Sequence, residues 1–262
     1  MEAWALPRDA APGIAPQEAA NARAALVSAR GLHTATDAYL VTLVRARRTG
    51  AFEAIYDRYH GPIAAFCRHL LGDPEEAADA VQHTFLAAYS AIVSSSKPIL
   101  LRAWLFTIAR NRCYSVLRTR RQQASGEPIE PVTEGLTTQV LRRESVRQLL
   151  GDLQRLPEDQ RAALVMAELG SLSHHEIASV LGVQTGKVKA LVFQARESLL
   201  AMRAARDTDC SVIRELLATQ RGGALRRGNL RRHLRDCPGC REFRDQIARR
   251  PQRLSAVASP TS

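Results

Sequence analysis

The sequence lacks long apolar runs, abundant aromatic residues and a recognisable export signal. No run of about 18 consecutive apolar residues occurs, so no membrane insertion is predicted. The N-terminal segment lacks the basic start, apolar middle and small-residue cleavage site of a secretory signal, and we therefore expect a cytoplasmic protein. Aromatic residues make up only 5% of the 262 residues and Val/Ile/Thr-rich runs are scarce, which argues against an all-β sandwich or barrel.

Familiar catalytic patterns are missing as well. The sequence contains no evident nucleophile–base pair, phosphate-cradling glycine loop or paired-carboxylate site, so we expect no enzymatic activity of its own. The five cysteines include a Cys-x-x-Cys pair, which in a chain without an export signal favours thiols or metal ligands over a disulfide framework.

Positive charge, by contrast, is abundant. The chain has 37 Lys and Arg against 26 Asp and Glu, a net charge of +11. This balance favours a polyanionic partner, because basic side chains that neutralise phosphates release condensed counterions. Composition alone does not distinguish nucleic acid from an anionic membrane surface.

Helical periodicity begins at about Phe52 and predicts an all-α fold. Asp73, Pro74 and two glutamates have the pattern of an N-cap, a first-turn proline and acids facing the helix dipole. Residues 94–98 interrupt the pattern. A third helix follows, whose predicted buried side is Leu101, Trp104, Leu105 and Ile108, and several arginines crowd its end. These cations could also simply stabilise a helix C-terminus.

Composition and periodicity divide the chain into six segments. We expect a partly disordered N-terminal extension over 1–48, a helical domain over 49–121, an acidic linker over 122–140, a second helical domain over 141–206, a small module over 207–250 and a disordered tail over 251–262.

The second helical domain has a helix-turn-helix pattern. Ser173 and Glu176 fit a capping box, Gly182 ends the short helix, and Thr185 is predicted to cap a second helix that runs to about Met202. The predicted internal seam is Ile177, Ala178, Leu181, Val183, Val188 and Val192. Two ordinary helices of an α domain would share this periodicity, but the basic face of the second helix favours insertion into the major groove.

Several segments resemble extracytoplasmic-function (ECF) RNA polymerase sigma factors. Residues 156–164 (LPEDQRAAL), 172–183 (LSHHEIASVLGV) and 188–196 (VKALVFQAR) resemble the domain that reads the promoter −35 element. Residues 79–85 (DAVQHTF) resemble the core-polymerase-binding helix, and residues 104–113 (WLFTIARNRC) resemble the helix that reads the −10 element. The motifs occur in the family's order and separation.

The resemblance implies two partners, the RNA polymerase core and promoter DNA, and a set of site residues. The core polymerase would be bound by Asp79, Gln82 and Phe85. The melted −10 strand would be held by Trp104, Arg110, Asn111, Arg112 and Arg118, with residues 94–100 receiving a flipped base. The −35 element would be contacted by Thr185, Lys187, Lys189, Gln194 and Arg196. A separate anti-sigma factor is a further candidate partner.

Some positions depart from the family pattern. Ala80 and His83 replace the usual Leu and Glu, Ala190 and Leu191 stand where a Ser-Arg pair often contacts the −35 backbone, and Gln194 replaces a common arginine. Since a charge-assisted hydrogen bond contributes roughly 1.5 to 3 kcal/mol in a dry setting, we expect a weak −35 contact or an unusual −35 sequence.

The C-terminal segment has the spacing of a zinc site. His233, Cys237 and Cys240 form a His-x3-Cys-x2-Cys motif, and Cys210 supplies a fourth ligand for a tetrahedral zinc ion. Too few apolar residues are present for a sizeable core, so the metal would contribute much of the folding free energy. Free thiols in a basic tail and a thioredoxin-like pair are the alternatives, and the pair lacks the expected βαβ context.

The same motif resembles the zinc-binding module of anti-sigma factors. This resemblance suggests an internal regulator that packs on a DNA-binding domain, or a redox sensor whose thiolates lose zinc on oxidation. The arginine-rich flank could instead touch DNA directly; it comprises Arg226, Arg227, Arg231, Arg232 and Arg235.

Two other functions fit parts of the sequence. A stand-alone helix-turn-helix regulator would bind duplex DNA tightly without polymerase, whereas a sigma factor should bind weakly until core polymerase is added. A zinc redox switch that sequesters a sigma factor would have no use for residues 104–112 or for the recognition helix.

Overall fold

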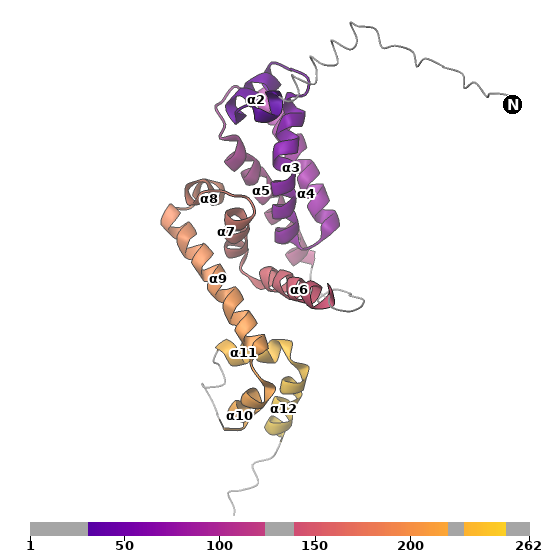
Figure 1. Cartoon of the computed structure of the whole chain (residues 1–262), viewed down its shortest axis with the longest axis vertical. Helices are drawn as coiled ribbons and strands as arrows, with labels where there is room; N and C mark the ends of the chain where they lie inside the picture. The colour runs from indigo at the N-terminus through magenta and orange to yellow at the C-terminus, as the bar shows by residue number, and fades with distance from the viewer. Residues whose placement is uncertain (1–30, 124–138, 220–227, 250–262) are drawn as a thin grey trace, which may run out of the picture. The chain divides into compact units, whose positions relative to one another are not determined.

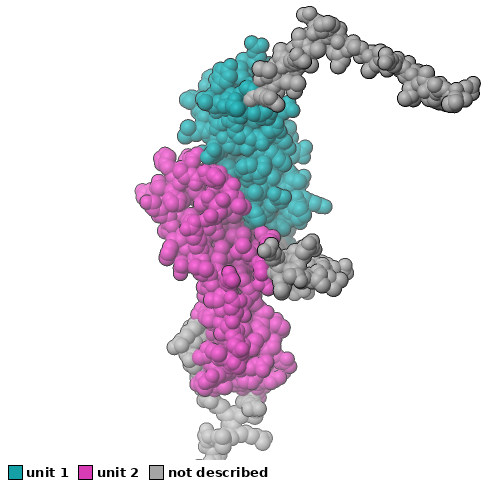
Figure 2. All heavy atoms as spheres, in the orientation of Figure 1, with its two compact units in different colours: residues 1–127 teal, residues 128–262 magenta. Residues whose placement is uncertain are grey.

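The computed structural model describes residues 31–123, 139–219 and 228–249, and no β-strand occurs in these ranges. The all-α fold is therefore confirmed for this part of the chain. The chain divides into two compact units, residues 1–127 and residues 128–262 (Figure 2). Most of the predicted acidic linker, the first thirty residues, the tail from residue 250, and Arg226 and Arg227 lie outside the described residues.

The described part of the first unit contains three long helices and a shorter one packed around a shared core (Figure 1). They are α2 (Asp37–Arg45), α3 (Ala51–Leu71), α4 (Pro74–Ser94) and α5 (Leu101–Gln123). Phe66 and Phe106 meet edge to face at the buried centre, with ring centroids 5.5 Å apart. This packing orients the outer faces of α4 and α5, which carry the predicted site residues.

Helix α2 lies within the segment predicted to be an N-terminal extension, so the packed domain begins earlier than residue 49. Leu40, Val41 and Val44 are buried. Asp37 accepts hydrogen bonds from Arg58 Nη1 at 2.6 Å and from the Tyr59 hydroxyl at 2.5 Å on α3. Burial, together with this hydrogen bond, raises the pKa of Tyr59 to about 12. Apolar burial and a polar tether therefore both hold α2 on the domain.

The predicted start of α4 is confirmed, whereas the predicted buried side of α5 needs correction. Asp73 Oδ1 accepts from the backbone N–H groups of Glu75 and Glu76 at 2.9 Å, and Pro74 is the first helical residue. On α5, Leu101 and Leu105 are buried as predicted, but Trp104 and Ile108 are only half-buried. Other residues complete the buried side, namely Ala103, Phe106, Ala109 and Cys113.

The second unit contains the predicted helix-turn-helix. Its helices are α6 (Gln139–Arg155), α7 (Glu158–Glu168), α8 (His174–Leu181) and α9 (Thr185–Asp207). The capping box is present, with Glu176 N–H donating to Ser173 Oγ at 3.2 Å and Ser173 N–H donating to Glu176 Oε2 at 2.8 Å. Gly182 ends α8 with φ of +68°, in the left-handed region that favours glycine.

Three details of this motif differ from the prediction. Gln184, not Thr185, precedes α9, and it makes no side-chain cap. Val183 is 37% exposed rather than part of the seam, because it follows the tight turn at Gly182, whereas the other predicted seam residues are buried. Helix α9 also continues past Met202 to Asp207, since α11 packs against its last turns.

The C-terminal helices form a small module within the second unit. They are α10 (Cys210–Thr219), α11 (Gly228–Asp236) and α12 (Pro238–Arg249). Figure 1 shows α11 beside the C-terminal end of α9. The buried cluster of the module is small and comprises Ile213, Leu217, Leu230, Leu234 and Cys240. Cores of this size usually need a further constraint such as a metal.

Candidate functional site

The predicted −10 residues lie on the outer side of α5. Trp104, Asn111 and Arg118 recur at intervals of seven residues, which places them on one face of the helix. Trp104 is half-buried and the other two are exposed. Arg110 and Arg112 flank this face on opposite sides. Trp104, Asn111 and Arg118 thus form a strip along one face, with an aromatic ring at one end, and Arg110 and Arg112 lie to either side of it.

The two flanking arginines have different surroundings. Arg110 Nη2 donates to Asn111 Oδ1 at 2.8 Å, and its guanidinium lies 5.2 Å from the centroid of the Tyr114 ring. Arg112 Nε is buried without a hydrogen-bond partner. Arg120, two residues beyond Arg118, has a structural role instead, because it pairs with Glu76 and donates to the Leu71 carbonyl at 2.9 Å.

The segment between α4 and α5 is tied to α2. Arg45 Nη2 donates to the backbone carbonyl of Lys97 at 2.5 Å. Leu100, at the end of this segment, is 78% exposed, and its carbonyl accepts from Trp104 N–H in the first turn of α5. This segment includes most of the predicted base-receiving residues 94–100. Sequence patterns do not predict the Arg45 contact, because it joins residues 52 positions apart.

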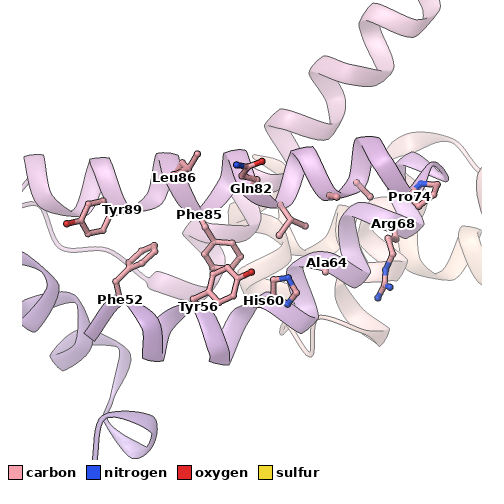
Figure 3. Close-up of a pocket in the computed structure, with 13 residues that line it drawn as sticks. Phe52, Tyr56, His60, Ala64, Arg68, Pro74, Gln82, Phe85, Leu86 and Tyr89 are labelled. Atoms are coloured by element: carbon pink, nitrogen blue, oxygen red, sulfur yellow. The ribbon is translucent and has the colours of Figure 1, made fainter. Parts of the chain in front are cut away.

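A groove between α3 and α4 carries part of the predicted polymerase-binding set. It encloses about 830 Å³, and Figure 3 shows Gln82, Phe85, Leu86 and Tyr89 of α4 above Phe52, Tyr56 and His60 of α3. Gln82 and Asp79 are exposed, but Asp79 does not line the groove. Phe85 is only 4% exposed, and its ring lies 4.7 Å from that of Tyr56.

The groove also contains apolar residues that the sequence prediction did not single out. Leu86 is 64% exposed, Tyr89 44% and Tyr56 40%. Their helical spacing alone would have indicated core residues, and only the structure shows that they are exposed to solvent. An exposed apolar groove with a polar rim is typical of a protein-docking site.

The predicted −35 residues lie along α9. Lys187, Lys189, Gln194 and Arg196 are exposed, and Thr185 is half-buried. Two of them contact α7: Arg196 pairs with Glu168 at 2.5 Å and Gln194 accepts from Gln160 at 3.3 Å. Each of these contacts would have to open before the side chain could bind DNA.

Two apolar residues of α9 refine the comparison with the family pattern. Leu191 is only 5% exposed, so it belongs to the domain core rather than to the DNA-facing side. Phe193 is 65% exposed on the opposite side of the helix. The sequence prediction did not single out Phe193, although an apolar side chain in the major groove can contact a thymine methyl group.

The four predicted metal ligands come together in the C-terminal module. Their ligand atoms all lie within 4.8 Å of one another, with Cys210 Sγ 3.8 Å from both His233 Nε2 and Cys237 Sγ. Cys210 begins α10, His233 lies on α11, Cys237 immediately precedes α12, and Cys240 lies in the first turn of α12. A Cys₃His set from three elements matches the donor chemistry of a closed tetrahedral zinc site.

Hydrogen bonds and burial affect the orientation and protonation of three of these residues. His233 is 3% exposed, and its Nδ1 lies 2.8 Å from the Ala205 carbonyl. A proton on Nδ1 would satisfy this carbonyl and leave Nε2 free to bind the metal. The backbone N–H of Cys240 is the main cause that lowers the pKa of Cys237 to about 7, whereas burial raises the pKa of Cys240 to about 11.

Both helical domains match known families. Residues 55–123 match the family described as Sigma-70 region 2, and residues 147–199 match the one described as Sigma-70, region 4. RNA polymerase sigma-H factor of Pseudomonas aeruginosa is 30% identical over 176 residues, covering 62% of this chain and 91% of that protein. The chain belongs to the sigma-70 family, within its ECF group.

Other relatives of this sigma factor support the same family assignment. ECF RNA polymerase sigma factor EcfG of Rhodopseudomonas palustris is 35% identical, over 53% of this chain and 78% of that protein. A solved structure of CnrH in complex with the cytosolic domain of CnrY aligns with a TM-score of 0.51 and 26% identity, covering 66% of this chain and 99% of the other. The second of the two family matches ends at residue 199, so neither includes the C-terminal module. In the described part of the sigma factor, no helix is both long and apolar enough to span a bilayer.

Proposed function

We propose that this sigma factor binds core RNA polymerase and directs it to promoters through the −10 and −35 elements. The observation that carries the proposal is the presence of regions 2 and 4 in one chain, each with an exposed surface suited to its partner. The chemistry of RNA synthesis belongs to the polymerase, and the sigma factor contributes binding and recognition. It acts in the cytoplasm, where the polymerase and its template are found.

In this proposal, the α3–α4 groove docks on the polymerase. Gln82 and Asp79 would provide orientation through hydrogen bonds, and the exposed rings and Leu86 would provide apolar burial. Phe85 would contribute indirectly, because its ring is buried and packs against Phe52 and Tyr56 rather than facing the polymerase.

The two DNA-facing surfaces would then read different forms of DNA. On α5, Trp104 could stack on an unpaired base, while Arg110, Asn111, Arg112 and Arg118 hold the phosphates of the opened strand. On α9, Lys187 and Lys189 would contact duplex phosphates at the −35 element. Reading an opened strand couples recognition to melting.

Run-off transcription with purified core polymerase on a library of random promoters tests this function. We expect the full-length protein to direct transcription from a subset of templates that share −10 and −35 sequences, and to bind duplex DNA weakly without core polymerase. Failure to associate with core polymerase, or equal use of all templates, would contradict the proposal. Tight binding of the free protein to one duplex sequence would instead support a stand-alone regulator.

We also propose that Cys210, His233, Cys237 and Cys240 bind one structural zinc ion, and that the module regulates region 4. When bound, zinc supplies the positive charge that holds three thiolates together. The small apolar core of the module supports a metal requirement. Metal analysis of protein purified without chelator should give one zinc per chain, and the double variant Cys237→Ser/Cys240→Ser should give none.

The regulatory role has its own test. Deletion of residues 207–262 should change promoter-specific transcription or its response to oxidants, because the module packs on the reading domain. Unchanged activity together with an unchanged redox response would exclude regulation by the module and leave the sigma function intact.

A further inference from the structure

The metal module shares an interface with the last turns of the recognition helix. Helix α11 packs against α9, and Ala205 on α9 is fully buried there. The only described hydrogen-bond partner of His233 Nδ1 is the carbonyl of this same residue, at 2.8 Å. The atom that fixes the orientation of a metal-binding imidazole therefore belongs to the DNA-reading domain, not to the module.

A group of four charged residues reinforces this interface. Asp152 of α6 is 2% exposed and accepts from Arg206 of α9 through both of its oxygens, at 2.7 Å each. Arg155 of α6 lies 2.9 Å from Asp236 of α11 and 3.6 Å from Asp152. These four residues, which we call the charged junction, link α6, α9 and α11.

Separation of the helices that carry the charged junction would be destabilising. The Asp152 carboxylate is buried, and a buried charge that loses its partner is strongly destabilising. Arg206 immediately follows Ala205 on α9, so one turn of this helix contacts both Asp152 and the imidazole of His233. Movement of α11 away from α9 would break the contact between His233 and the Ala205 carbonyl and the ion pair between Asp236 and Arg155.

We infer that metal binding in the module and folding of the −35-reading domain are coupled through this interface, so that the module clamps the C-terminal end of the recognition helix. The inference rests on the proposed zinc site and names its intramolecular partner. Holding His233 in place favours metal binding, and metal binding keeps α11 on α9. By linkage, each process must strengthen the other to the same extent.

Hydrogen exchange of the full-length protein, with zinc bound and after chelation, measures the coupling directly. We expect amides of residues 158–207 to exchange at least tenfold faster after chelation, as well as those of the module itself, while residues 51–123 remain unchanged. Faster exchange confined to residues 210–249 would overturn the inference, because the module would then unfold without affecting its neighbour.

Substitution of alanines on α9 provides a matched pair. In Ala205→Leu, the larger side chain enters the buried interface and should separate α11 from α9, lowering zinc affinity about tenfold, the lower end of the effect seen for outer-shell partners of metal ligands. Ala204 is exposed, so Ala204→Leu adds the same side chain at the preceding, solvent-facing position and should leave zinc affinity unchanged. Competition with a chromophoric chelator gives both affinities. Equal affinities for the two variants would contradict the coupling.

A second pair removes charge rather than adding volume, and so remains informative if Ala205→Leu fails to fold. Arg206→Ala removes the cation that faces Asp152, whereas Arg203→Ala removes an exposed cation that pairs with Asp207. We expect weaker zinc binding only for Arg206→Ala. If the wild-type protein binds no zinc, the proposed metal site itself is wrong. If it binds zinc but the two variants within each pair have equal zinc affinities, only the coupling is wrong.

Discussion

At the scale of the single residue, Arg45 joins two segments that are distant in sequence. It lies in the last turn of α2 and donates to the carbonyl of Lys97, between α4 and α5. Because this segment precedes the Trp104 strip on α5, its conformation sets how an opened strand would approach the domain. Arg45 is therefore a positioning residue for the proposed −10 reader, although it need not contact DNA.

Arg45→Ala should change the choice of −10 sequence rather than the folding of the first unit. Loss of a hydrogen bond worth roughly 0.5 to 1.5 kcal/mol predicts a severalfold loss of discrimination between −10 variants. Run-off transcription from templates that differ at single −10 positions measures it. Arg48→Ala, which changes a nearby exposed arginine, is the control. Identical −10 preferences for Arg45→Ala and wild type would show that the tether has no role in recognition.

At the scale of the secondary-structure element, helices α4 and α9 each have one buried side and one exposed side. On α4, the buried side packs on α3 and α5, which leaves Gln82, Leu86 and Tyr89 along the groove. On α9, burial of Val188, Leu191 and Val192 directs the lysines and Phe193 outward. Each element therefore supports a separate prediction.

Leu86→Lys should weaken binding to core polymerase at least tenfold, about 1.4 kcal/mol, because it places a charge on an apolar docking surface. Titration of labelled protein with core polymerase gives the affinity. The side chain is 64% exposed, so the first unit should keep its stability. Leu200→Lys, at a similarly exposed position on α9, serves as the control and should bind normally. Normal polymerase binding by Leu86→Lys would exclude the groove as the docking surface.

Lys189→Ala should lower affinity for −35 DNA about equally for all sequences and reduce the slope of log affinity against log salt by about 1, since one phosphate contact is lost. Phe193→Ala should instead relax sequence preference, because an apolar contact to a base carries sequence information. Salt titrations of the polymerase complex on several −35 sequences distinguish the two effects. A change of sequence preference in Lys189→Ala would contradict its assignment as a phosphate contact.

At the scale of the whole molecule, the chain comprises two units with different requirements for stability. The first unit has a core that includes Phe66, Phe106 and Ile63, all nearly inaccessible to solvent. The second combines the helix-turn-helix core with a module whose apolar cluster is small. A metal requirement should therefore be confined to the second unit.

Removal of zinc should lower the unfolding temperature of the second unit and leave that of the first unit unchanged. A ligand that binds only the folded state stabilises it by mass action, and a loss of about 2 kcal/mol corresponds to a decrease of roughly 4 to 8 °C for a unit of this size. Differential scanning calorimetry with and without chelator measures both transitions. Equal shifts of the two transitions, or no shift, would contradict this assignment.

Much of the fold and of the site was predictable because the signals are local. Helical spacing, the Asp73 cap, the Ser173–Glu176 box and the glycine turn each depend on residues a few positions apart. The sigma-factor motifs are also local, and the family matches confirm the domains they predicted. Two of the wrong details, Val183 and the cap at Thr185, lie at a turn, where a shift of one residue changes which side chain is buried.

The sequence by itself determined the all-α class, the two promoter-reading domains and the identity of the four Cys and His residues, because periodicity and spacing are properties of neighbouring positions. Only the tertiary structure decided that Phe85 lies beneath the groove, that Leu191 belongs to the core, and that consecutive residues of α9, Ala205 and Arg206, contact His233 and Asp152. Those features depend on which side of one helix meets another helix, and spacing within a single helix does not specify its partner.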